Sequence, residues 1–472
     1  MLRRRFLFCP MVLWALGAKA QEIAFDEEYD IVVVGGGGAG LAAAARAGEL
    51  GADVILLEKN NALGGNTLIS GGFLGVVDNK RPKNRSYLDS PERHIKDIWE
   101  NGDRIANKKL IECLVKESPR MLAWIESKGV KFQDSLVEIY GSHFPRCHVP
   151  LQPNGLAYVR ALSAEVMRNK TPVLTSCKVI GLIENSSGRV IGVRALHKGR
   201  ERNIRARKAV ILAAGGFGAN RELVSQFDPR LTGLATNSSQ GSTGEVLLAA
   251  SRLGADVVDM EQIQFLPGPL PNGKIRARLH NNVQRFIFVN SEGKRFVDER
   301  SRRDVLTAKV LELPEKRCFC IIDQAGLESY DLLVQRDAIR AAESGDAVKA
   351  DSIAELASKL GLDPKILLQT VTDRNSEIKE DKTDSRLPIS KPPFWASIVT
   401  MRIHYTMGGV KIDERAQCLR SGKPVSGLFA AGEITGGIHG KNRIGGNGLA
   451  DALTFGMIAG ESAFNTTKNL SQ

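Results

Sequence analysis

The sequence predicts an α/β fold in which a domain built on a parallel sheet is interrupted by an α+β capping domain. Short apolar segments followed by glycines, typical of buried parallel strands, occur at residues 29–40, 208–216 and 428–432. This pattern stops near Gln262 and returns after His404. A chain of 472 residues is long enough for two domains. We therefore expect the parallel-sheet domain at 27–261 and 404–466, and the capping domain at 262–403.

The first strand, helix and second strand of the sheet follow one another near the N-terminus. Apolar runs predict strands, and an alanine-rich stretch between them predicts a helix; the expected ranges are Tyr29–Val34, Leu41–Leu50 and Asp53–Leu57. Together they form one βαβ unit, as in a Rossmann-like domain. Between the first strand and the helix, Gly35, Gly37 and Gly40 have the G-x-G-x-x-G spacing of a dinucleotide-binding loop.

This loop predicts where a cofactor pyrophosphate binds, at the N-terminus of the helix. Glu58 ends the second strand and can accept hydrogen bonds from the adenosine ribose. By itself the glycine spacing does not separate FAD from NAD, so an ordinary NAD dehydrogenase remains an alternative.

The remaining elements follow from apolar runs and helix start signals. Residues 92–128 are expected to be helical, as are residues 243–253, and strands are expected at residues 208–214, 285–290 and 428–431. Ser352 and Glu355 form a capping box, and Pro364 occupies a first helical position. Residues 379–393 are charged and rich in proline, which predicts a loop. A final helix is expected to begin near Asn447.

Three further glycine-rich segments favour FAD over NAD, because together they form a cradle longer than NAD requires. They are the loop at residues 64–72, the strand end at residues 213–216, and the segment at residues 431–433. Gly432 lets the backbone approach a ligand, and Glu433 can accept hydrogen bonds from a ribityl chain. Arg443 precedes a helix N-terminus, which suits a carboxylate or a negatively charged flavin carbonyl.

With these motifs, residues 27–466 resemble the flavoprotein of the soluble fumarate reductase and flavocytochrome c family, which is related to succinate dehydrogenase flavoproteins. The resemblance implies FAD contacts, besides the fingerprint glycines, at Ala39, Glu58, Asn66, Thr67, Gly71, Gly72, Val179, Glu245, Tyr405, Glu433, Gly448 and Leu449. Membrane-bound relatives attach FAD through a histidine in the second glycine loop. Residues 66–70 contain no histidine, so we expect noncovalent FAD.

The same resemblance implies a substrate site. Arg303 matches the arginine that protonates the substrate, His404 a substrate-binding histidine, and Arg443 the arginine that binds the substrate carboxylate. Gly446 is assigned to the same substrate-binding set. From the spacing alone, Arg303 would instead be a purely electrostatic clamp or a surface ion pair with Asp304. No metal site is expected.

The chemistry requires residues of these types. Reduction of an alkene beside a carboxylate moves a hydride from flavin N5 to the β carbon, and negative charge then builds on the α carbon and the carboxylate. Two guanidinium groups and an imidazole stabilise that charge most strongly in a dry cleft. Arginine is an unusual acid, because its pKa lies above about 12. It can donate only to a carbanion-like centre, with immediate reprotonation.

The sequence departs from the family at the other end of the substrate pocket. Leu266 stands where family fumarate reductases have a histidine that holds the second carboxylate, and Leu279 and Asn282 replace a proton-relaying glutamate and arginine. Candidates for the missing relay lie nearby, at Arg278, His280 and Arg285. An α,β-unsaturated acid with one carboxylate and an apolar or aromatic tail is therefore a candidate substrate. Fumarate remains another, because Arg278 could restore a dicarboxylate site.

Two further alternatives come from other classes of flavoprotein. A ketosteroid dehydrogenase-like enzyme would need tyrosines as acid and base, and only Tyr405 stands out. A non-catalytic electron-transfer flavoprotein would not need Arg303, His404 and Arg443 together.

Residues 1–20 predict export to the bacterial periplasm. Arg3–Leu7 resembles a twin-arginine signal, an apolar run follows, and Ala18–Ala20 has the small-x-small form of a cleavage site; an ordinary secretory signal is the alternative. The net charge is +12, and removing residues 1–20 takes away four cations and no acids, which leaves +8. A basic surface suits a small anionic substrate or an acidic redox partner.

The electron donor is expected to be a separate protein. No Cys-x-x-Cys-His sequence occurs, so no c-type haem is attached to this chain, and electrons would come from a cytochrome or a quinol-linked system. Such a supply is typical of anaerobic respiration and electron transport. The sequence contains nothing that resembles a nucleic-acid-binding module.

Overall fold

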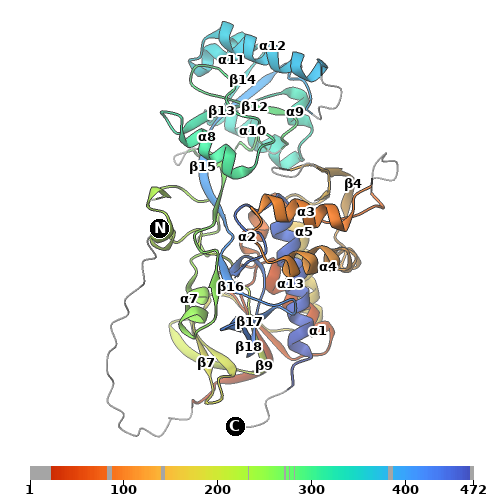
Figure 1. Ribbon diagram of the computed structural model, residues 1–472, viewed down its shortest axis with the longest axis vertical. Helices are drawn as coiled ribbons and strands as arrows, with labels where there is room; N and C mark the ends of the chain where they lie inside the picture. The colour runs from red at the N-terminus through yellow and green to blue at the C-terminus, as the bar shows by residue number, and fades with distance from the viewer. Residues whose placement is uncertain are drawn as a thin grey trace.

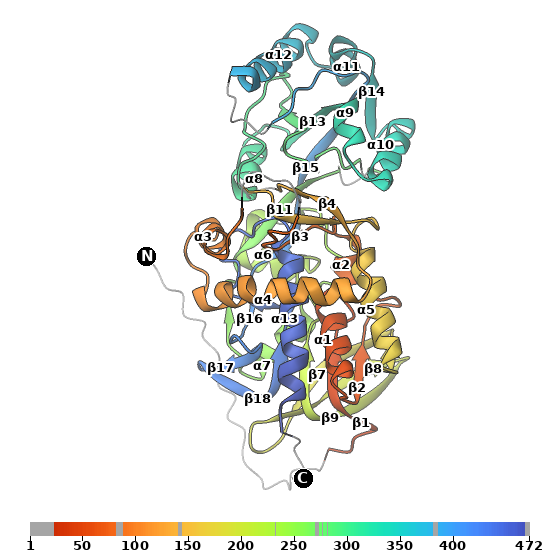
Figure 2. The same cartoon turned by 90° about the vertical axis from the view of Figure 1, so that its right-hand side faces the viewer.

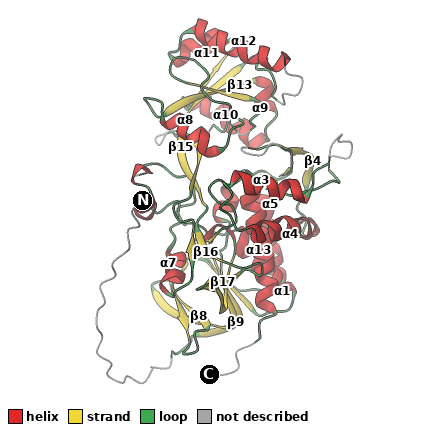
Figure 3. Ribbon diagram, viewed as in Figure 1, coloured by secondary structure: helices red, strands yellow, loops and turns green. Residues whose placement is uncertain are grey.

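The computed structural model describes residues 23–81, 88–139, 144–231, 233–269, 273–275, 277–280, 282–380 and 386–467, so the expected export signal lies outside the described residues. The chain forms two lobes stacked along the long axis of the molecule (Figure 1). Helices and strands are present in both lobes (Figure 3). Within the described part of the chain, no helix is long and apolar enough to cross a membrane.

A mostly parallel sheet forms the centre of the lower lobe. Its strands are β1 (Glu27–Val34), β2 (Val54–Leu57), β6 (Val173–Leu174), β7 (Cys177–Glu184), β8 (Val190–His197), β9 (Arg200–Leu212), β17 (Gln417–Arg420) and β18 (Lys423–Ala430). The parallel strands have the order β18-β9-β1-β2-β6, with β17 at one edge and the β7–β8 hairpin joined to β9. Val33 pairs with Leu56 on one side and with Ile211 on the other. The predicted parallel strands are therefore confirmed.

Two helices pack together on this sheet, α1 (Gly38–Glu49) and α13 (Asn447–Phe464). They can approach closely because their contact is made of alanine and glycine: a Cβ on Gly456 would lie 2.5 Å from the carbonyl oxygen of Ala39. The predicted start of the first helix at Leu41 is wrong, because α1 begins at Gly38. Gly40 therefore lies in the first helical turn, where a Cβ would lie 1.8 Å from the Gly35 carbonyl oxygen.

The other elements of the lower lobe surround the sheet. The helices are α2 (Gly65–Ile69), α3 (Pro91–Asn101), α4 (Lys108–Ser127), α5 (Leu156–Arg168), α6 (Arg221–Phe227), η1 (Pro229–Leu231), α7 (Glu245–Arg252) and η2 (Gly432–Ile434). The short strands are β3 (Leu74–Gly75), β4 (Phe132–Val137), β5 (Cys147–Pro150), β10 (Val257–Val258), β16 (Gly409–Lys411) and β19 (Thr435–Gly436). The predicted helices at residues 92–128 and 243–253 are confirmed by α3, α4 and α7.

The upper lobe is an antiparallel sheet covered by helices. The strands are β11 (Ile263–Gly268), β12 (Phe286–Val289), β13 (Arg317–Asp323), β14 (Ala347–Ala350) and β15 (Phe394–Thr406). The helices are α8 (Arg303–Leu311), α9 (Gln324–Glu328), α10 (Leu332–Ser344), α11 (Ile353–Leu360) and α12 (Pro364–Glu380). Ser352 Oγ accepts a hydrogen bond from the Glu355 amide at 3.1 Å, as the capping box predicted.

Strand β15 connects the two lobes. Its first half pairs with β13 and β14, and its second half, which includes His404 and Tyr405, pairs with β11. The strand runs from the upper lobe toward the lower lobe (Figure 2). The proposed boundary between residues 403 and 404 thus falls inside one strand. The upper lobe has hydrophobic clusters of its own, built largely from residues 277–401.

Candidate active site

One elongated cavity lies at the carboxyl ends of the parallel strands and extends to the junction of the lobes. The lower lobe contributes glycines and small polar side chains, and the upper lobe contributes Leu266, Arg278, His280 and Arg303. Of the predicted cofactor residues, those that line the cavity are Gly35, Gly37, Ala39, Glu58, Asn66, Thr67, Gly71, Gly72, Val179, Glu245, Tyr405, Glu433, Gly448 and Leu449. The predicted substrate residues Arg303, His404, Arg443 and Gly446 line it as well. Gly40 does not, since it lies inside α1.

Glu58 and Glu245 lie at the end of the cavity near the glycine loop. The Glu58 carboxylate accepts hydrogen bonds from the amides of Gly36 and Asn60, both at 2.7 Å, and a carboxylate has further lone pairs for a ribose. Glu245 is bonded to Thr243 and forms ion pairs with Lys59 at 2.9 Å and Lys178 at 3.0 Å. Burial acts to raise the pKa of Glu245, but the bonds from Thr243 and Lys59 outweigh it and lower the pKa to about 2.

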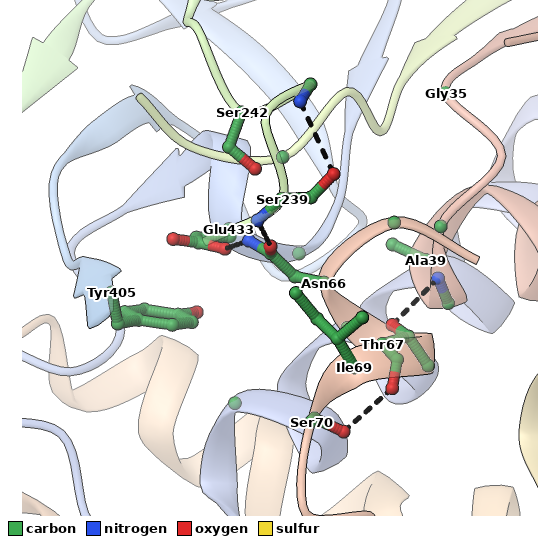
Figure 4. A pocket seen from close by; sticks show the side chains of 18 of the residues that line it. Gly35, Ala39, Asn66, Thr67, Ile69, Ser70, Ser239, Ser242, Tyr405 and Glu433 are labelled. Atoms are coloured by element: carbon green, nitrogen blue, oxygen red, sulfur yellow. Dashed lines mark hydrogen bonds between the residues drawn. The ribbon is translucent and has the colours of Figure 1, made fainter. Parts of the chain in front are cut away.

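A hydrogen-bonded network crosses the middle of the cavity (Figure 4). Asn66 Nδ2 donates to Glu433 Oε2 at 2.8 Å, and the Ser239 amide donates to Asn66 Oδ1 at 2.6 Å. The Thr406 amide donates to Glu433 Oε1 at 3.1 Å. Burial raises the pKa of Glu433 despite these bonds. The carboxyl group is therefore fixed at the end of β18, where open α/β sheets bind ligands.

Glycine backbone makes this cavity wide enough for a long cofactor. At Gly216, a Cβ would lie 2.0 Å from Thr406 Oγ1 and 2.8 Å from Glu433 Oε1, so only glycine fits behind the network. Gly432 has a φ of +76° and lies against Ala39, where a Cβ would be 2.9 Å from the alanine Cβ. An extended cavity with acceptors at one end, a polar middle and cations at the other fits FAD.

Arg443 provides a buried cation at the substrate end. Its side chain is 5% exposed, its Nη1 donates to the Ile444 carbonyl at 3.2 Å, and its Cζ lies 4.3 Å from the centre of the Tyr405 ring. No ion pair to Arg443 occurs among the described residues. Burial lowers the pKa of Arg443. A buried guanidinium of this kind favours an anionic ligand in the cavity.

Arg303 faces the same end of the cavity from the upper lobe. It is the first residue of α8, it is 4% exposed, and its Nη1 donates to Gln264 Oε1 at 2.6 Å. The alternative that Arg303 forms a surface ion pair with Asp304 is wrong, because Arg303 is buried and Asp304 binds Arg302 at 2.7 Å.

Gln264 is a residue that sequence reasoning missed. While its oxygen accepts from Arg303, its Nε2 donates to the Arg443 carbonyl at 2.8 Å and to Asn442 Oδ1 at 3.0 Å. One buried amide therefore ties the two predicted substrate arginines together. The only sequence signal was its position, two residues before Leu266 on a strand next to the predicted site.

Apolar side chains also line the cavity. They are Leu266, Ile139 and Phe73, and Arg278 and His280 line it as well. The charge of Arg278 is already engaged, since Nη2 lies 3.3 Å from Asp337 Oδ2 and Nη1 donates to Asn154 at 2.8 Å. Arg285, the third candidate for a proton relay, does not line the cavity, and neither do Leu279 and Asn282, which stand at the family's relay positions.

The comparisons with known proteins agree with this geometry. Residues 30–449 match the FAD binding domain family. The fumarate reductase (cytochrome) of Shewanella frigidimarina is 34% identical, over 93% of this chain and 77% of that protein. The urocanate reductase of Eggerthella lenta is 34% identical, over 92% and 74%. The NADH:acrylate oxidoreductase of Vibrio harveyi is 31% identical, over 95% of this chain and 52% of that protein, so the chain spans about half of its length.

Solved structures show the same fold. A flavocytochrome c3 fumarate reductase in an open conformation matches with a TM-score of 0.74 and 31% identity, over 93% of this chain and 78% of that chain. A 3-ketosteroid-Δ4-(5α)-dehydrogenase from Rhodococcus jostii RHA1 matches with a TM-score of 0.72 and 27% identity, over 95% and 99%.

The fold and the cavity define an FAD-dependent oxidoreductase. The chain belongs to the FAD-binding flavoprotein family that includes these fumarate, urocanate and acrylate reductases. The alternative of an ordinary NAD-binding dehydrogenase is therefore wrong.

Proposed function

We propose that this protein reduces the C=C bond of an α,β-unsaturated carboxylate, with Arg443 and His404 binding the carboxylate and Arg303 supplying the proton. The observation that carries the proposal is the pair of buried arginines tied through Gln264 at one end of an FAD-sized cavity. The names of the relatives support it, since they are reductases of fumarate, urocanate and acrylate.

The chain's own groups divide the work as follows. FAD supplies the hydride when it is bound in the cavity. The Arg443 guanidinium holds the carboxylate by charge-assisted hydrogen bonds, and the His404 imidazole adds a further polar contact. Because Gln264 accepts from Nη1, the Arg303 guanidinium keeps a fixed direction from which it can deliver a proton to the α carbon. Burial of both arginines excludes water, which strengthens their effect on developing charge.

The apolar part of the cavity lining favours a substrate with a single carboxylate. Leu266, Ile139 and Phe73 offer apolar surface to a substrate tail, and the charge of Arg278 is shared with Asp337. A second carboxylate would have to compete with Asp337 for that guanidinium, at a cost in desolvation. An acrylate with an apolar or aromatic substituent therefore fits better than fumarate.

A substrate panel tests the activity. Anaerobic turnover with reduced viologen is expected for at least one of fumarate, methacrylate, cinnamate and urocanate, with a larger kcat/KM for the monocarboxylates. Activity with none of the four acids would sink the proposed function. Leu266→His adds a polar group among the apolar side chains of the lining, so it is expected to shift the substrate preference toward fumarate. Leu313→His, in the upper lobe outside the cavity, is the control.

The mode of FAD attachment has a direct test. Residues 66–70 at the cavity offer no histidine for a covalent bond, so we expect the flavin to be held by noncovalent contacts alone. After precipitation of the purified protein with acid, the yellow colour should remain in the supernatant. Colour that stays in the pellet and migrates with the chain on a denaturing gel contradicts this prediction.

A ketosteroid dehydrogenase is the second candidate, because the structural match between this protein and one such enzyme covers 99% of that enzyme's chain. Tyr405 is the one tyrosine among the described residues that line the cavity, and its hydroxyl is 3.3 Å from Asp451. A two-tyrosine acid and base set is not supported by that lining. Oxidation of 4-androstene-3,17-dione with an artificial acceptor, in place of acid reduction, would favour this candidate.

The location and the electron donor complete the proposal. Residues 1–20 would export the protein to the periplasm, and a separate cytochrome or quinol-linked protein would supply electrons. The names of relatives and fold neighbours, a cytochrome-type and a quinol-type fumarate reductase, support such donors. Recovery of the protein in the periplasmic fraction, in a form shortened at the N-terminus, tests the first point.

A further inference from the structure

We propose that Asp103 is a positioning residue that holds the two substrate arginines at their working separation. Its Oδ1 lies 2.5 Å from Nη1 of Arg302, the residue just before Arg303, and its Oδ2 lies 3.1 Å from Nζ of Lys441, two residues before Arg443. Figure 2 shows α3, which ends just before Asp103, next to α8 at the junction of the lobes. The inference rests on the proposed roles of the two arginines.

The backbone around Asp103 is built to hold this side chain in place. Asp103 and Arg104 both have left-handed conformations, with φ of 53° and 61°. Such residues persist only where the surroundings determine them. Here the Lys441 amide donates to the Gly102 carbonyl at 3.2 Å, and a Cβ on Gly440 would lie 2.4 Å from that same oxygen. The turn after α3 and the loop that leads to Arg443 therefore form one packed unit.

A buried chain of amides runs beside the ion pairs. Asn442 Nδ2 donates to Asn101 Oδ1 at 3.0 Å, Gln264 Nε2 donates to Asn442 Oδ1 at 3.0 Å, and Arg303 donates to Gln264. The end of α3, the loop of Arg443 and the start of α8 are thus joined twice, once in the interior and once nearer the surface. The amide chain sets the orientation of Arg303, and the Asp103 ion pairs hold the lobes close enough for that chain to form.

Electrostatics explains why an acid is needed at this position. Arg302 and Lys441 approach the same carboxylate from the two lobes, and the hydrogen bond from Arg302 lowers the pKa of Asp103. Asp304 binds Arg302 on the same side of the junction, so it does not link the lobes. Without Asp103, two cations would face each other and push the capping lobe away.

The test compares the holoenzyme variants Asp103→Asn and Asp103→Glu with the wild type. Glu312→Gln is the control, because its ion pair with Lys309 lies at the C-terminal end of α8 and does not link the lobes. For Asp103→Asn we expect kcat to fall about tenfold, with KM changed less than about twofold, since misplacement of Arg303 affects the proton transfer and not carboxylate binding. Asp103→Glu should recover most of the loss, and Glu312→Gln should match the wild type.

Two more readouts separate positioning from a loss of structure. Wild-type kcat should fall as salt screens the ion pairs, whereas the kcat of Asp103→Asn should rise with salt, because salt screens the repulsion between Arg302 and Lys441. Amide hydrogen exchange in the first turn of α8 should be faster in Asp103→Asn, with exchange in α10, FAD content and melting temperature unchanged. The double variant Asp103→Asn with Lys441→Gln should regain activity, because one of the two repelling cations is gone.

The outcomes are distinguishable from failure of the proposed function. If the wild type reduces no unsaturated acid, the proposed function fails. If the wild type is active and Asp103→Asn has the same kcat and the same salt dependence, this inference alone is overturned. It is also overturned if the double variant is no better than Asp103→Asn.

Discussion

Replacement of Arg303 by alanine is expected to lower kcat for an unsaturated acid by about 10³-fold while FAD remains bound. A positioned general acid contributes about 10²–10⁴-fold, and Arg303 also stabilises the charge that builds on the α carbon. Its guanidinium is buried and held by Gln264, so no solvent cation can take its place. Steady-state kinetics with reduced viologen, together with the flavin absorbance per chain, measures the effect.

Matched variants make this result specific. Lys309→Ala lies on the same helix, is half-exposed and pairs with Glu312, so it should keep wild-type activity. Arg303→Lys retains a positive charge but has a titratable ammonium, so its residual activity should fall at high pH where the arginine enzyme stays active. A purely electrostatic clamp predicts substantial activity in Arg303→Lys with no new pH dependence. Full activity in Arg303→Ala removes the catalytic assignment.

Much of the fold could be predicted because local sequence determines it. The parallel strands are apolar runs that end in glycines, and the capping box at Ser352 and the proline at 364 mark helix starts. These signals depend on neighbours in the chain. The predicted start of α1 is wrong because the three glycines of the fingerprint indicate a loop. Gly38 and Gly40 instead lie in the first helical turn, where a Cβ would collide with Thr67 at the first position and with Gly35 at the second.

The network behind the site could not be predicted in the same way. Gln264 contacts residues 39 and 179 positions away, and Asn442 contacts one 341 positions away. Such contacts form only when β11, α8 and the loop of Arg443 meet at the junction of the lobes. An amide in a strand carries no local signal that it will bridge two arginines.

The segment around Leu279 shows that a shift of one residue changes which side chain faces the cavity. The family resemblance pointed to Leu279, yet Arg278 and His280, on either side of it, line the cavity while Leu279 is fully buried in the capping core. Neighbours in an irregular segment point in different directions, so only the structure decides which side chain faces the substrate. His280 is the candidate for a proton relay that the cavity lining favours over Arg285.

Replacement of Arg443 by methionine is expected to raise KM for the acid by roughly 100-fold or more, equivalent to ~3 kcal/mol of binding. Methionine keeps most of the packing against Tyr405 but removes the charge, so the loss reports on carboxylate binding. Arg443→Lys should recover only part of it, because an ammonium cannot make the two parallel hydrogen bonds of a guanidinium. Substrate titration of the flavin absorbance gives the dissociation constant directly.

Lys423→Met is the matched control. Lys423 is an exposed cation of the same lobe, and it lies at the start of β18, whereas the cavity lies beyond the end of that strand. The comparison also fixes the direction in which the substrate lies. If Arg443→Met binds the acid as tightly as the wild type while Arg278→Met does not, the carboxylate binds at Arg278. The substrate would then be reversed in the cavity, with its apolar tail against Tyr405, and Arg303 would face the β carbon, which receives the hydride and not the proton. The two variants therefore test the orientation of the substrate and, with it, the assignment of Arg303 as the proton donor.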